Sequence, residues 1–197
     1  MHNRMESGFD LLYLIVTVIF GVLTLRNAKG RKQFNIFSIM TFVLVGGDAF
    51  HLVPRVWALN HGGVENYTAS LGFGTFVTSI TMTIFYLLLF QFWKIRYHKR
   101  AKRLTGVMYV LSGLRIFLCF LPQNAWLREG GATTGWGTIR NLPFIAMGMI
   151  MIGLFYQTRG DLSFRFMWIA IIISFVFYLA VVLFVKAFPK MGMLMLP

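Results

Sequence analysis

The stretch "QFNIFSIMTFVLVGGDAFHLV", residues 33–53, is a long apolar run that carries an aspartate and a histidine near its end. About 20 apolar residues are needed to cross a hydrocarbon core roughly 30 Å thick, and this run has that length. Its apolar residues follow one another instead of alternating with polar ones, which favours a helix over a strand of a barrel. The stretch therefore predicts a membrane-spanning helix with Asp48 and His51 near one end.

The rest of the 197-residue chain continues this pattern. Hydrophobic residues make up 57% of it, charged residues only 13%, and the mean hydropathy is +0.69, whereas soluble domains carry about 25% charged residues. We therefore expect an all-α fold, a polytopic transmembrane helix bundle that forms a single domain over residues 1–197. Six spans are predicted: Phe9–Leu25, Gln33–Val53, Leu71–Trp93, Leu104–Leu121, Asn141–Tyr156 and Phe166–Phe188. The closing "MGMLMLP", residues 191–197, is either the end of the protein or the start of a seventh helix.

The basic residues predict the orientation of the bundle. Most of the 19 lysines and arginines fall in the links after the first, third and fifth spans, above all in "KIRYHKRAKR", residues 94–103. By the positive-inside rule these links are cytoplasmic and the N-terminus is outside, as in a multi-pass protein of a bacterial-type inner membrane. The net charge of +13 is then explained by topology and by contact with anionic headgroups. Membrane lipids are the expected partners, and nucleic acid is not.

Three ionisable residues share one face of the second predicted span. Asp48, His51 and Arg55 are spaced i, i+3 and i+7. A charged side chain inside a membrane normally faces the bundle interior and has a partner. Arg115, in the fourth span, is expected at a similar depth below the outer surface, so we predict an Asp48–Arg115 ion pair. Such a pair either marks a polar pocket or only fixes the packing of a structural scaffold.

The third span adds a stripe of small and hydroxyl-bearing residues. Gly72, Thr75, Ser79, Thr83 and Tyr86 recur at steps of three and four, which is typical of a helix-packing seam. The outer part of the stripe is expected at the level of the ion pair. The sequence therefore leaves two interpretations open, a packing seam and the polar wall of a cavity that opens outward.

The functional hypotheses follow from this cavity. In the first, it binds or transports a small anionic or amphiphilic ligand. In the second, Asp48 and His51 act as an acid–base pair on a lipid bond, with Ser79 or water as nucleophile. No cofactor or metal is expected, because no His-x-x-x-His pair occurs, and a homo-oligomer or partner subunit is possible. The candidate ligand-binding residues are Asp48, His51, Arg55, Thr75, Ser79, Arg115, Asn124 and Arg140.

Two segments resemble the lysoplasmalogenase-type membrane hydrolases, "GGDAFHL" and "LGFGTFVTSITMTIFYLLLF". The resemblance covers the second and third spans and implies seven or eight helices and a lipid-hydrolase activity. Thr83 stands where that family has a histidine, and the later spans lack the family's second aspartate. The matching positions are Gly47, Asp48, Leu52, Gly74, Phe76 and Tyr86.

Overall fold

The computed structural model describes residues 2–61, 63–127 and 134–187. All regular structure within these ranges is helical, which confirms the all-α prediction. The elements in chain order are α1 (His2–Asn27), α2 (Lys32–Asn60), the 3₁₀ turn η1 (Val64–Tyr67), α3 (Thr68–Arg96), α4 (Lys102–Phe120), the 3₁₀ turn η2 (Pro122–Asn124), α5 (Thr134–Gln157) and α6 (Met167–Ala187).

Five helices of the described residues are long and apolar enough to cross a membrane, as expected of a multi-pass membrane protein. They comprise Ser7–Asn27, Lys32–Asn60, Thr68–Arg96, Lys102–Phe120 and Gly135–Gln157. The sixth predicted span corresponds to α6, whose fully described part, Met167–Phe177, is apolar but too short to cross alone. The possible seventh helix, at residues 191–197, lies outside the described residues.

The second predicted span is longer than expected. The sequence predicts an end near Val53, ahead of Pro54, but α2 continues through Pro54 to Asn60. A proline within a helix cannot donate to the carbonyl four residues earlier, here that of Phe50. The helix tolerates this loss because α3 packs against the same carbonyl, as described below. Asp48 therefore lies well inside α2, roughly 18 Å from its last residue at 1.5 Å per residue.

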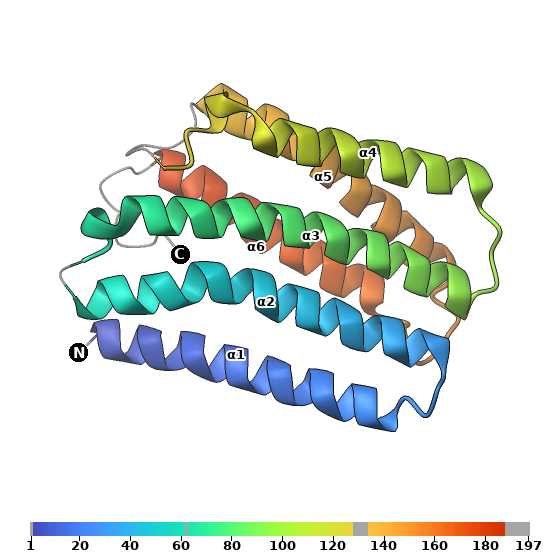
Figure 1. Ribbon diagram of the computed structural model, residues 1–197. Coiled ribbons are helices and arrows are strands. Elements are labelled where there is room, and N and C mark those ends of the chain that lie inside the picture. The colour runs from blue at the N-terminus through green and yellow to red at the C-terminus, as the bar shows by residue number, and fades with distance from the viewer. Residues whose placement is uncertain (1, 62, 128–133, 188–197) are drawn as a thin grey trace. The chain divides into compact units, whose positions relative to one another are not determined.

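The chain divides into two compact units, Met1–Phe144 and Ile145–Pro197. In the first unit, α1 packs on α2, α2 on α3 and α3 on α4, so that neighbours in sequence are neighbours in space (Figure 1). In the second unit, the later part of α5 packs on α6, where Gly148 lies against the ring of Phe175.

Glycines set the close approach of α2 and α3. The Thr78 hydroxyl donates to the carbonyl oxygen of Gly47 at 3.0 Å, so the two backbones nearly touch. At Gly74 an added Cβ would meet Phe50 O and would lie 2.7 Å from His51 Cα. The Gly74 Cα–H therefore points at the Phe50 carbonyl that Pro54 leaves without a helical donor, a weak Cα–H···O contact. Small residues at a membrane helix interface commonly allow such contacts.

The outward faces of the first unit carry large apolar side chains. Such exposure would be costly in water, but it is the expected surface of a helix that faces lipid. Examples that are each more than 60% exposed are Phe9, Phe20, Val110, Phe117 and Phe120.

Candidate functional site

Asp48 has a partner on α1. The hydroxyl of Tyr13 donates to its Oδ2 at 2.7 Å, and both side chains are half-buried between α1 and α2. Nearer the end of the same seam, the Asn60 side-chain amide donates to the Ser7 hydroxyl at 3.2 Å. Asp10, one turn before Tyr13, is also buried. The α1–α2 contact is therefore a polar seam, which we call the α1–α2 seam.

His51 and Arg55 continue this polar region along α2. His51 lies close enough to Asp48 for their charges to interact. Its Nδ1 is buried and makes no hydrogen bond to the residues that the structure describes. Arg55 is buried as well, with 9% of its surface exposed. The structure thus brings together three of the predicted site residues, as their i, i+3, i+7 spacing required.

The ion pair predicted between Asp48 and Arg115 is replaced by two separate contacts. α3 lies between α2 and α4, so the two helices that carry these residues do not pack on each other (Figure 1). Asp48 turns to Tyr13 on α1. The Arg115 guanidinium lies over the ring of Phe144 on α5, 3.7 Å from its centre.

Ser79 and its neighbours lie on the side of α3 that faces away from α2. Gly74 marks the face toward α2, and Ser79 follows five residues later, about 140° around the helix. Ser79 is buried, and its hydroxyl donates at 2.8 Å to the carbonyl of Thr75. Thr75 in turn donates at 2.9 Å to the carbonyl of Leu71. The predicted nucleophile is therefore not placed against His51.

Arg115 is the centre of a second cluster, formed by α3, α4 and the first part of α5. Only 3% of its surface is exposed. Tyr86 of α3 packs edge-on against Phe144, with ring centres 5.0 Å apart, and the charge of Arg115 acts on its phenol. Thr83, one turn along the same face of α3, is fully buried. We call these four residues the Arg115 cluster.

Asn124 and Arg140 close the end of α4. The Asn124 amide donates to two carbonyls of the last turn of α4, at 2.7 Å to Leu118 and 3.1 Å to Cys119, and at 2.8 Å to the carbonyl of Leu121, which follows the helix. Leu118 and Leu121 also accept backbone N–H bonds, at 3.4 Å from Leu121 and 3.2 Å from Asn124, so the amide completes the cap of this helix end. Arg140 donates to the Asn124 side-chain oxygen at 2.7 Å.

Trp126 completes this cap. The Arg140 guanidinium lies 4.1 Å from the centre of its ring, and its indole N–H donates to the Cys119 carbonyl at 2.9 Å. At Gly72 an added Cβ would meet the Trp126 carbonyl, so the segment after η2 is pressed against α3. Asn124 and Arg140, predicted as ligand-binding residues, therefore have a structural task.

The predicted residues consequently fall into two groups on opposite sides of α3, not around one cavity. Tyr13 is not among the predicted site residues, although its position one turn after Asp10 on the same helix face is a usable signal. Phe144 is not among them either, because nothing in a run of apolar residues distinguishes it. Among the described residues, no three His, Cys, Asp or Glu side chains are grouped so that they could hold a metal ion.

Comparison with known proteins adds no assignment: no family model, no curated protein and no solved structure matches this chain. The resemblance to the lysoplasmalogenase-type hydrolases therefore stays a prediction. Two of its positions, Gly47 and Gly74, lie where α2 and α3 approach each other closely, which is a packing requirement.

Proposed function

We propose that this chain is a multi-pass protein of the cell membrane, with its N-terminus outside, that binds or transports a small anionic or amphiphilic ligand. Arg115 is the residue that meets the anionic group. The observation that carries the proposal is a guanidinium that is 3% exposed within a membrane-type helix. Ionisable residues at such positions are costly to insert and commonly mark ligand or ion pathways.

The surroundings of Arg115 support this choice. Its guanidinium stacks on the π face of the Phe144 ring, which stabilises the positive charge away from water. A guanidinium carries five N–H donors in a planar fork that matches a carboxylate or phosphate. Buried hydroxyls of Ser79 and Thr83 occupy the adjoining face of α3. The cluster thus combines a cation, aromatic walls and polar groups, which suits an amphiphile with an anionic head.

A ligand titration tests the proposal. Dodecyl phosphate should raise the unfolding temperature of the wild-type protein in dodecyl maltoside, whereas dodecanol, which lacks the charge, should not. Arg115→Lys should keep most of the effect, and Arg115→Met should lose it. Arg159→Met is the matched control, because Arg159 also lies over a ring, that of Tyr156, but is exposed. Equal stabilisation of the Arg115→Met and wild-type proteins would contradict the proposal.

The orientation needs a separate test. A cysteine at Asn60 should react with an impermeant thiol reagent in intact cells, because Asn60 ends α2 on the proposed outer side. A cysteine at Lys99, in the α3–α4 link, should react only after the cells are opened. The native Cys119 is fully buried and should give little background. Labelling of Lys99 in intact cells would reverse the orientation and place the ligand site on the cytoplasmic side.

The second candidate is a structural scaffold, and two observations favour it. Asp48 is engaged by Tyr13, and Asn124 is engaged by the end of α4. Under this alternative Arg115 also serves packing alone, and dodecyl phosphate stabilises no variant. The hydrolase alternative, with Asp48 and His51 as acid–base pair, needs a water nucleophile, since Ser79 lies on the far side of α3.

A further inference from the structure

The link between α3 and α4 is held in a defined turn. The backbone N–H of Tyr97 donates to the carbonyl of Trp93 at 3.0 Å, and that of Lys99 donates to the carbonyl of Lys94 at 3.1 Å. The second bond spans six residues, as in a Schellman motif, with His98 in the left-handed region at φ +51°. A residue other than glycine is uncommon there. The turn fixes where the side chains of this basic link start.

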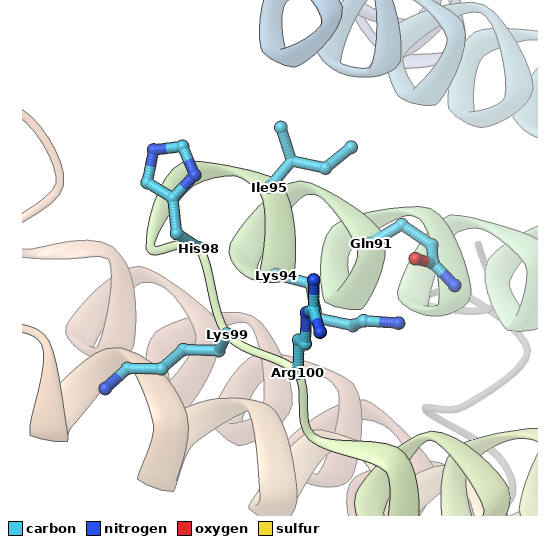
Figure 2. A pocket seen from close by; sticks show the side chains of 6 residues that line it. All are labelled: Gln91, Lys94, Ile95, His98, Lys99 and Arg100. Carbon is cyan, nitrogen blue, oxygen red and sulfur yellow. The ribbon is translucent and has the colours of Figure 1, made fainter.

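A hollow of about 550 Å³ lies beside this turn. Figure 2 shows that the Arg100 side chain rises toward Lys94, and that Lys94 extends toward Gln91, whereas Lys99 points away from them. His98, Lys99 and Arg100 are exposed. The hollow is lined by Gln91, Lys94, Ile95, His98, Lys99 and Arg100.

Neighbouring side chains hold the walls of the hollow. The Lys94 ammonium lies 5.5 Å from the centre of the Phe90 ring, and the Gln91 amide donates to the Tyr109 hydroxyl of α4 at 3.1 Å. Residues 91–103 contain seven lysines, arginines or histidines and no acid. Lys94 and Arg100 therefore hold two positive charges near each other, with no carboxylate in the same segment to neutralise them.

We propose that this hollow binds the phosphate group of an anionic lipid headgroup, with Lys94 and Arg100 as its main contacts. A guanidinium and an ammonium together suit phosphate oxygens, the former by paired N–H donors and the latter as a point charge. α3 is a membrane-type helix that ends at Arg96, so the hollow lies at the height of the headgroups. Two cations favour a phosphomonoester, which carries up to two charges, over a phosphodiester, which carries one.

This site is separate from the one under the proposed function, since none of its residues belongs to the Arg115 cluster, and Lys94 lies about 12 Å further along α3 than Tyr86 at 1.5 Å per residue. A specific site in the hollow also differs from a diffuse basic surface in how the basic residues share lipid binding. In a diffuse surface every lysine and arginine of the link contributes alike, whereas here two of them contribute most. Lys102 and Arg103 directly follow the link, in the first turn of α4, and do not line the hollow, so they provide a control of equal charge.

The experiment counts lipids bound to the full-length protein by native mass spectrometry in a neutral detergent. Phosphatidic acid is titrated against the wild type, the Lys94→Gln/Arg100→Gln variant and the Lys102→Gln/Arg103→Gln variant. The first variant should weaken the tightest binding event at least tenfold, and the second less than about threefold. Phosphatidylglycerol, a phosphodiester, should bind the wild type more weakly than phosphatidic acid. Equal losses in the two variants, or equal affinities for the two lipids, would overturn the proposal.

Two further measurements complete the test. Inorganic phosphate at 10 mM should leave bound phosphatidic acid in place, which assigns the site to a lipid. Displacement by phosphate at that concentration would mean that free phosphate is the ligand, and would overturn the assignment to a headgroup. If the double variant unfolds in detergent, Arg100→Gln alone is used, because Arg100 is exposed and outside any helix. That single variant should still weaken binding more than Arg103→Gln does.

Discussion

Gly74→Ala should destabilise the protein by moving α3 away from α2. The added Cβ would meet Phe50 O and would lie 2.7 Å from His51 Cα, and both atoms belong to the backbone of α2. Backbone cannot turn aside as a side chain can, so the helices must separate by a few tenths of an ångström or more. Overpacking of this kind costs about 1–3 kcal/mol. For a chain of this size that is roughly 2–12 °C in unfolding temperature.

Two other glycines provide graded controls for this prediction. At Gly47 an added Cβ would meet the Thr81 hydroxyl, which can rotate away, and would lie 2.8 Å from Thr81 Cβ, which cannot. It would meet no backbone atom, so Gly47→Ala should cost less than Gly74→Ala but more than nothing. At Gly46 nothing lies within 4 Å, so Gly46→Ala should be neutral or slightly stabilising.

The single cysteine makes the assay direct. Cys119 is fully buried, so a thiol-reactive fluorophore should label it only as the protein unfolds on heating. The labelling temperature should be highest for Gly46→Ala, lower for Gly47→Ala and lowest for Gly74→Ala. If Gly74→Ala and Gly46→Ala unfold at the same temperature, the close approach of α2 and α3 is refuted.

Three further substitutions test individual contacts by the same labelling transition. Tyr13→Phe should cost about 1–3 kcal/mol, because it leaves the Asp48 carboxylate without its donor; no change would show that the bond contributes nothing. Asn124→Asp, which keeps the size of the side chain but removes its N–H donors, should cost a similar amount by uncapping α4. Phe144→Leu should cost about 0.5–2 kcal/mol through the lost ring contact with Arg115, beyond the smaller loss of apolar packing.

The length and continuity of the apolar runs were sufficient to predict the helices. Backbone hydrogen bonds in lipid admit few alternatives, so a run such as residues 33–53 had to be helical. Its end was predicted less well, because Pro54 was taken as a stop signal. A proline removes one hydrogen bond and does not prevent the next turn from forming. Whether the freed Phe50 carbonyl finds another contact depends on Gly74, which is 24 residues away.

The partners of the polar residues could not be predicted from depth alone. Depth along a helix follows from counting residues, and it placed Asp48 and Arg115 at similar heights. The pairing of helices does not follow from such a count, since it depends on which faces pack. The small residues of α3 serve two faces, one toward α2 at Gly74 and one toward the segment after η2 at Gly72. The predicted stripe of small and hydroxyl-bearing residues, which includes Gly72 and Ser79, lies on the second of these faces and does not include Gly74.

The separation of Asp48 from Arg115 changes which residue has a functional meaning. If Asp48 and Arg115 formed an ion pair, each would neutralise the charge of the other. Helix packing alone would then account for both residues, and neither would indicate a ligand. In the structure, Asp48 accepts a hydrogen bond from Tyr13, which ties α1 to α2 and gives the carboxylate a structural task. Arg115 instead lies over Phe144, with 3% of its surface exposed. A guanidinium buried in a membrane-type helix is costly to insert and suits an anionic ligand, which is why the proposed function rests on Arg115 rather than on Asp48.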